Sequence, residues 1–270
     1  MNSMSRMFPW SAAVECRSGA QHAALIAIPC LVMLAGCRAG RWPQREGIIR
    51  PEGVYVLHLP GIVGDVGFDE DFADGLICGG VQDVELIDWT GPNPLGNLTS
   101  ERIHQRGARM LVDRIEQLHL TIPEARLVVS AHSGGAEPVL LALERMKPGA
   151  VEQVWLLAPA VSRARPLEVA AGQTKRLVNV CSNGDWLFLG LGTSLIGTSD
   201  GPKADAAGRH GFSPHDAATL PANLEQWPYQ HGWRKFDYHG GHISIMSGEF
   251  AQEVIAPSML HWMPTGPPAD

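Results

Sequence analysis

Five short apolar runs rich in β-branched residues recur along the chain, separated by longer segments with helical character. Each run is almost continuously apolar, whereas a strand with one face in water alternates apolar and polar residues. The runs therefore indicate strands that are covered on both faces, as in a parallel sheet. They span residues 54–59, 84–89, 126–130, 154–157 and 176–181.

Residues 101–118, 138–146 and 250–260 carry apolar side chains at helical spacing. Strands that alternate with helices predict an α/β fold with a doubly wound, mostly parallel sheet flanked by helices. A chain of 270 residues with 45% hydrophobic content can bury one large core. We expect residues 235–238 to form the last strand. Residues 190–233 are rich in Gly, Asp and Pro and are expected to form a long loop over the functional edge of the sheet.

The first 36 residues have the layout of an export signal. An uncharged apolar run at 23–36 follows a stretch that carries Arg6 and Arg17. This run is shorter than the roughly 20 residues of a membrane-spanning helix. It ends in Leu-Ala-Gly-Cys at 34–37, which resembles the lipobox of bacterial lipoproteins. The resemblance implies that residues 1–36 are removed and that Cys37 is lipidated; a buried N-terminal helix in a soluble domain stays an alternative.

After Cys37 we expect a tether to residue 52 and one domain from 53 to 270. The resemblance implies the bacterial cell envelope, and Arg38 favours the periplasmic face of the outer membrane in a cell with two membranes. Removal of the leader and acylation leave Cys78 and Cys181. An oxidising compartment permits their pairing. The sequence leaves open whether they pair or form two separate buried thiols, and it leaves the oligomeric state open.

A serine stands directly past the run 126–130, in the pentapeptide Ala-His-Ser-Gly-Gly at 131–135. At the tip of a strand–turn–helix the backbone is strained, and small neighbours two positions away let the chain reverse. The pentapeptide resembles the nucleophile elbow of the α/β-hydrolase superfamily, G-x-S-x-G, with Ala131 in place of the first glycine. The resemblance extends over about 54–260. It implies that Ser133 is a nucleophile.

The resemblance also implies two backbone donors for an oxyanion. One is the N–H of Gly134, at the positive end of the following helix. The second comes from the loop after an earlier strand. Here that loop is Pro-Gly-Ile-Val-Gly at 60–64, which is similar to the family's His-Gly-x-x-Gly with proline replacing histidine, and it implies the Ile62 N–H.

A serine hydroxyl needs a base, and the base needs a group that orients it. The family order is serine, acid, histidine. Asp185 follows the strand at 176–181 and is the preferred acid, with Asp200 as the alternative. His242 precedes an apolar segment that leads into the last helix and is the preferred base, with His239 as the alternative.

Other patterns exclude several function classes. The net charge is −7 and no basic stripe is present, which argues against a nucleic-acid partner. Neither H-E-x-x-H nor paired Cys-x-x-Cys occurs, so no metal is expected. The glycine-rich stretch 190–197 lacks the spacing of a nucleotide-binding loop. We therefore expect no cofactor, and His132 is expected to pack.

Together these patterns predict an exported, lipid-anchored serine hydrolase that cleaves a small-molecule ester or related acyl bond through an acyl-enzyme. The membrane is expected as a partner through the anchor alone. The chain has no long insertion after 154–157 to form a large lid, which favours small or soluble esters. Two alternatives stay open: a non-catalytic binding protein of the same fold at the cell surface, and an acyltransferase that uses the same serine.

Overall fold

A computed structural model describes residues 53–182, 206–214 and 219–262. These residues form one six-stranded sheet in the order β2-β1-β3-β4-β5-β6, and all five strand pairs are parallel. The doubly wound parallel α/β fold expected from the sequence is confirmed. The strands are β1 (Val54–Leu59), β2 (Asp83–Leu86), β3 (Arg126–His132), β4 (Val151–Leu157), β5 (Thr174–Val180) and β6 (Leu224–Trp227).

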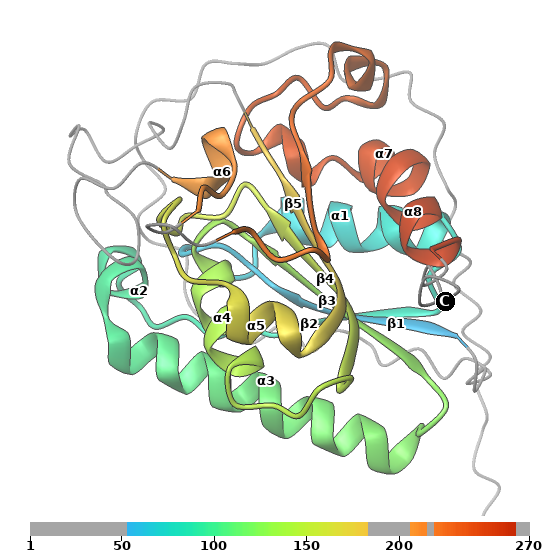
Figure 1. Cartoon of the computed structure of the whole chain (residues 1–270). Helices are drawn as coiled ribbons and strands as arrows, with labels where there is room; N and C mark the ends of the chain where they lie inside the picture. Colours follow the sequence, from blue (N-terminus) through green and yellow to red (C-terminus); the bar gives the residue numbers. More distant parts are fainter. Residues whose placement is uncertain (1–52, 183–205, 215–218, 263–270) are drawn as a thin grey trace, which may run out of the picture.

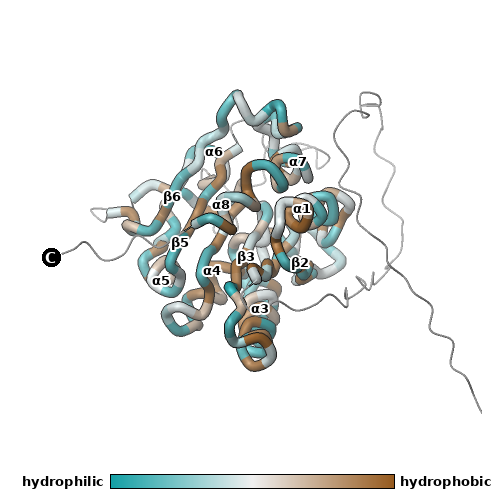
Figure 2. Tube along the Cα trace, turned by 90° about the vertical axis from the view of Figure 1, so that its right-hand side faces the viewer, coloured by the Kyte–Doolittle hydropathy of each residue, from teal (hydrophilic) through white to brown (hydrophobic). Residues whose placement is uncertain are grey.

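Helices cover both faces of the sheet (Figure 1). One face carries α1 (Gly67–Cys78), α7 (Gly248–Phe250) and α8 (Ala256–Leu260), the last two joined by a π-helical turn at Ala251–Ile255. The other face carries α3 (Glu101–Thr121), α4 (Ala136–Leu143) and α5 (Glu168–Gly172). The turned view in Figure 2 shows α1 and α3 on opposite sides of β3. The remaining helices are α2 (Pro94–Thr99), α6 (Ala207–His210) and the 3-10 turns Ser133–Gly135, His231–Phe236 and Ser244–Met246.

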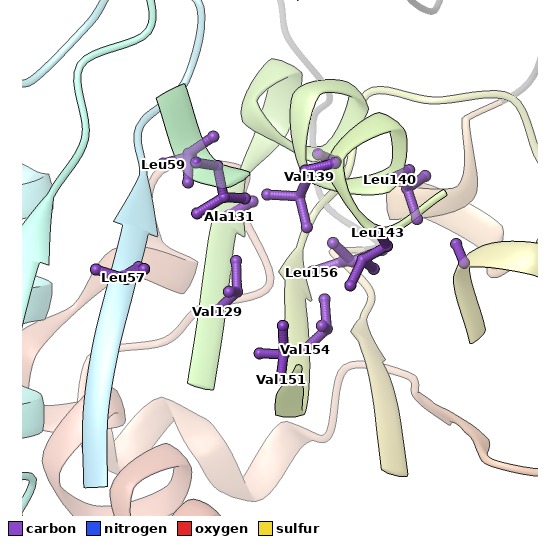
Figure 3. Packing of buried hydrophobic residues seen from close by; sticks show 14 of the residues in the cluster. Leu57, Leu59, Val129, Ala131, Val139, Leu140, Leu143, Val151, Val154 and Leu156 are labelled. Atoms are coloured by element: carbon purple, nitrogen blue, oxygen red, sulfur yellow. The ribbon is translucent and has the colours of Figure 1, made fainter. Parts of the chain in front are cut away.

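Strand alternation divides the core into two clusters. Side chains of Val129 and Ala131 on β3 pack with Val139 and Leu140 of α4, as Figure 3 shows. Val128, one position away on the same strand, belongs to the cluster under α1 and α8. Successive strand residues point to opposite faces of the sheet, and both faces are covered by helices. A central strand therefore needs apolar side chains at odd and at even positions alike. This explains why β1 and β3 read as nearly unbroken apolar runs.

The predicted last strand at 235–238 is wrong. His231–Phe236 is a 3-10 helix, and Asp237 after it takes a left-handed conformation with φ 58°. The sixth strand is instead Leu224–Trp227, inside the segment predicted as a long loop. This strand lies at the sheet edge, where its side chains are only half-buried. An edge strand needs less apolar surface, so the run Leu-Glu-Gln-Trp gave no clear signal.

Sequence patterns also missed α1, in which Gly75 and three aspartates interrupt the apolar spacing. The glycine has a packing reason. A Cβ on Gly75 would overlap the backbone of Gly248 at the start of α7, so its absence lets the two helices approach closely. Within the described residues no helix is both long and apolar enough to cross a bilayer.

Candidate active site

The strand order reverses beside β1, which pairs with β2 on one side and with β3 on the other. The segment after β1 leads to α1 on one face of the sheet, and the segment after β3 leads to α4 on the other face (Figure 1). In open α/β sheets, ligands bind at the carboxyl ends of the strands at this reversal. The loop at 60–66 and the turn Ser133–Gly135 flank this position.

Ser133 follows β3 directly and has φ 53°, in the left-handed region. A residue with a side chain pays about 1–2 kcal/mol for this conformation. The strain is tolerated because the turn Ser133–Gly135 leads straight into α4, which is packed in the core. The following glycines are required: a Cβ on Gly135 would overlap the Leu59 and Pro60 carbonyls. The strand–turn–helix geometry predicted for 131–135 is thus present.

The loop after β1 is held by buried side chains through its carbonyl groups. Trp89 Nε1 donates to the Pro60 carbonyl at 2.8 Å, and Asn97 Nδ2 donates to the Ile62 carbonyl at 2.8 Å. The Gly61 carbonyl accepts from Gly64 N at 3.1 Å. The bond to the Gly61 carbonyl holds the peptide plane that contains the Ile62 N–H, and the other two bonds anchor the loop on either side of it.

The two predicted oxyanion donors are neighbours. A Cβ built on Gly134 would overlap the Ile62 side chain and would stand 3.8 Å from the Ile62 nitrogen. A Cβ on Gly61 would stand 3.6 Å from Cβ of Ser133. The loop after β1 therefore lies against the serine turn, as an oxyanion hole shared between two loops requires.

The loop that carries the candidate bases is attached to the carboxyl end of β5. Ser182 Oγ donates to the Gly240 carbonyl at 2.6 Å, and the Tyr238 hydroxyl donates to the Cys181 carbonyl at 2.7 Å. Ser244 Oγ accepts from Gly241 N at 3.1 Å and so shapes the loop itself. Asp185 and Asp200, the two candidate acids, lie outside the described residues, as does Cys37.

The structure separates the two candidate histidines. His242 is buried, and its ring lies 4.7 Å, centroid to centroid, from the ring of His132, the residue before Ser133. His239 is half-exposed and binds the exposed Asp237 at 2.9 Å. His242 thus lies beside the serine turn, whereas His239 lies on the surface.

Burial, together with the neighbouring imidazole of His132, lowers the pKa of His242 well below 6.5. The imidazole is therefore neutral at pH 7, which is the form that accepts a proton. Among the described residues, the His239 ring pairs with Asp237 and not with the Ser133 hydroxyl.

A second set of serine, histidine and aspartate lies deeper in the molecule. His58 Nδ1 is bonded to Ser130 Oγ at 2.8 Å, and His58 Nε2 donates to Asp69 Oδ1 at 3.1 Å. All three side chains are fully buried. The sequence analysis missed this network, although a histidine and a serine inside otherwise apolar strands were a signal for buried polar partners.

Other candidate chemistry is not supported in the described part of the chain. Cys181 is a free, buried thiol, so it does not pair with Cys78. Burial raises the pKa of Cys181 to about 11, which leaves the thiol protonated and unreactive at neutral pH. No cluster of three or more His, Cys, Asp or Glu side chains in the described ranges is arranged to hold a metal ion.

The doubly wound parallel sheet with a strained serine between β3 and α4 has the α/β-hydrolase type of architecture. No family model and no curated protein match the chain. Among solved structures, it is similar to the lipase BlEst2 of Bacillus licheniformis, with 16% identity and a TM-score of 0.46 over 78% of this chain and 93% of that one.

Two further solved structures are similar. The LpqC poly(3-hydroxybutyrate) depolymerase of Bordetella parapertussis has 13% identity and a TM-score of 0.44 over 80% of this chain and 82% of that one. An extracellular α/β-hydrolase from a Paenibacillus species has 19% identity and a TM-score of 0.30 over 39% of this chain and 40% of that one, well under two thirds of its length.

Proposed function

We propose that this protein is a serine hydrolase that cleaves carboxylic esters through an acyl-enzyme. The observation that carries the proposal is the left-handed Ser133 at the strand–helix turn, placed at the reversal of the strand order with the Gly134 and Ile62 nitrogens next to it. A strained serine at the end of a sheet, with backbone N–H groups around it, suits attack on a carbonyl.

In the proposed reaction the Ser133 hydroxyl attacks the ester carbonyl and His242 accepts its proton. The carbonyl oxygen becomes negative and is stabilised by the N–H groups of Gly134 and Ile62. Collapse of this intermediate breaks the C–O bond, and His242 returns the proton to the leaving alcohol. Water then attacks the acyl-enzyme by the same route, which releases the acid and restores the Ser133 hydroxyl.

His242 is preferred to His239 as the base because it is buried beside the serine turn and neutral at pH 7. Asp185 is proposed as the carboxylate that orients His242. Its support is its place in the chain: Asp185 follows Ser182 by three residues, and Ser182 binds the histidine loop at Gly240. Asp200 stays the alternative acid. No cofactor takes part in this reaction.

Hydrolysis of p-nitrophenyl acetate and butyrate, together with labelling by a fluorophosphonate, tests the proposal. We expect turnover and labelling by the unchanged protein and neither by Ser133→Ala. A folded, unchanged protein that does neither would overturn the proposal and favour a binding protein of this fold. Product analysis with competing alcohols separates hydrolysis from acyl transfer, because a transferase forms a new ester.

We further propose that the enzyme is exported and anchored to the cell envelope through a lipid on Cys37. The support is the lipobox-like Leu-Ala-Gly-Cys at the end of an apolar run. Expression of the full chain in a bacterium with labelled palmitate tests this part. We expect the label in the membrane-bound protein, and no label when Cys37 is replaced by serine.

A further inference from the structure

His132 lies between the buried polar network and the serine turn. It is the last residue of β3, and its side chain points to the same face of the sheet as that of Ser130, two positions before it. The ring is 2% exposed and stands edge-on to the ring of Phe68 in α1, with centroids 5.7 Å apart. The element that carries the nucleophile therefore also carries a buried imidazole.

This imidazole contacts the candidate base at two points. His132 Nε2 donates to the backbone carbonyl of His242 at 3.0 Å, and the two rings lie 4.7 Å apart at 40°. One contact fixes the backbone of His242 and the other limits the position of its ring. The bond spans 110 residues of sequence, so it joins the base loop directly to β3.

The hydrogen bond also determines the tautomer of His132. A carbonyl oxygen only accepts, so Nε2 carries the hydrogen and Nδ1 is an acceptor. Nδ1 is buried and has no partner within the described residues. A Cβ on Gly61 would stand 3.2 Å from it, so this atom points toward the loop of the proposed oxyanion hole. Burial lowers the pKa of His132 to about 4, so the ring is neutral in the working range of the base.

We propose that His132 is a positioning residue that sets the separation between Ser133 and the base His242. This inference rests on the proposed serine hydrolase function. His132 touches no substrate in this account. It acts through its Nε2–H, which holds the His242 backbone, and through its ring, which packs on the His242 ring.

A side chain that served for packing alone would need only its volume and shape. His132 instead buries a polar atom without a partner, and an unsatisfied buried acceptor costs about 1–3 kcal/mol. An apolar residue at this position would avoid that cost. The bond to His242 is the gain that an apolar residue could not supply. Charged and titratable groups around His132 are His242, His58 and Asp69, the last of which favours its protonated form.

Three substitutions of His132 distinguish the effect of its Nε2–H donor from the effect of its side-chain volume. His132→Gln keeps an N–H at nearly the position of Nε2, His132→Leu removes it, and His132→Asn keeps an amide that is too short to reach the carbonyl. Ser130→Ala is the matched control, because it removes another buried polar group from the same face of β3. Thermal unfolding shows which variants are folded.

For the Leu and Asn variants we expect kcat on p-nitrophenyl butyrate to fall about 10- to 100-fold, as small misplacements of catalytic groups do, with KM within about threefold. Fluorophosphonate labelling of Ser133 slows in parallel. The acid limb of the kcat/KM profile moves to higher pH, because His242 loses a neighbour that lowers its pKa. The Gln variant recovers most of the activity, and the Ser130→Ala control stays within about threefold of the unchanged protein.

Two results overturn the inference while leaving the proposed function intact. The first is a folded Leu or Asn variant with unchanged kcat and an unmoved acid limb. The second is a Gln variant as impaired as the Leu variant, which would show that the ring alone matters. If the Leu variant does not fold, the comparison of Gln with Asn decides. Failure of the unchanged protein to label at Ser133 overturns the proposed function and this inference with it.

Discussion

The molecule holds two sets of the same residue types, and they differ in how the backbone presents them. Ser130, His58 and Asp69 form a continuous hydrogen-bonded chain inside the core, with bonds of 2.8 and 3.1 Å. Ser133 directly follows β3 and opens the turn Ser133–Gly135, and His242 lies in a glycine-rich loop before the turn Ser244–Met246. By its hydrogen bonds alone, the buried set of Ser130, His58 and Asp69 resembles a catalytic triad more closely than Ser133 and His242 do.

Under the proposed function, a hydrogen bond to histidine is not sufficient to make a serine reactive. Ser130 lies in the middle of a parallel ladder, where strands flank it on both sides and substrate cannot enter. Its neighbours' N–H groups are used by the sheet, so no donors remain for an oxyanion. Ser133 lies just past the ladder, strained and next to the Gly134 and Ile62 nitrogens. We therefore propose that the position relative to the strand end decides which serine reacts.

The largest expected effect comes from removing each serine in turn. Ser133→Ala lowers kcat by about 10⁴-fold or more, because the nucleophile is lost. Ser130→Ala leaves kcat within about threefold and lowers the free energy of unfolding by about 1–2 kcal/mol, the value of a buried hydrogen bond. Ester hydrolysis and urea unfolding of both variants check this. A folded but inactive Ser130→Ala variant together with an active Ser133→Ala variant would contradict the assignment of Ser133 as the nucleophile.

The two candidate histidines should differ in their effect on catalysis. We expect His242→Gln to lower kcat by about 10³- to 10⁴-fold, since general acid–base catalysis is lost. His239→Gln is the matched control, because its ring pairs with Asp237 on the surface. It should change kcat by less than about threefold. The reverse pattern in steady-state kinetics would transfer the role of base to His239.

Buried histidines near the site predict loss of stability in acid. The pKa of His132 is about 4 in the folded chain against 6.5 for an exposed imidazole. Between these values the unfolded chain binds a proton that the folded chain does not, so stability falls as the pH falls. His132 alone contributes a loss of about 3 kcal/mol from pH 6.5 to 4, and His242 and His104, whose pKa values burial also lowers, act in the same direction.

Urea unfolding at several pH values measures this loss. His132→Gln carries no titrating group at this position, so its stability should fall less steeply below pH 6.5. An identical pH dependence in the two proteins would contradict the assigned burial of His132.

The smallest effect concerns the loop after β1. Asn97→Ala removes the bond to the Ile62 carbonyl and should lower kcat about 10-fold with little change in KM, because the loop that carries the oxyanion donor loses one of its anchors. Asn93→Ala is a matched control on the same helix. It removes the cap of α2, worth about 1 kcal/mol of stability, without touching the loop. Equal kinetics for the two variants would remove Ile62 from the proposed mechanism.

Local patterns in the sequence were sufficient for the parts of the fold that depend on short-range chemistry. The bounds of β1 are those predicted, and the turn at 131–135 has the predicted strain, because apolar runs and small residues act within a few positions. β6 was missed because its stability comes from pairing with β5 and from Arg176, whose guanidinium binds Glu225 at 2.7 Å. Such partners are distant in sequence.

For the candidate site, the sequence indicated residues whose positions the structure describes in part, and their catalytic roles stay predictions. A serine at a strand end and a histidine before the last helix could be found from spacing. The role of His132 could not, because its bond to His242 crosses 110 residues and depends on how two loops meet. The His58 network likewise depends on the register that sets His58 opposite Ser130. The polar residues in the two strands signal that each needs a buried partner, but the sequence does not show which residue that partner is.

The central claim is that Ser133, and not the hydrogen-bonded Ser130, is the reactive serine. Treatment of the folded protein with a fluorophosphonate, followed by peptide mass spectrometry, tests it directly. The two serines lie on one stretch of chain, and fragmentation of the modified peptide locates the added phosphonate. We predict a single adduct on Ser133 that is absent at low pH, where His242 is protonated. An adduct on Ser130, or none on a folded and unmodified protein, would contradict the account.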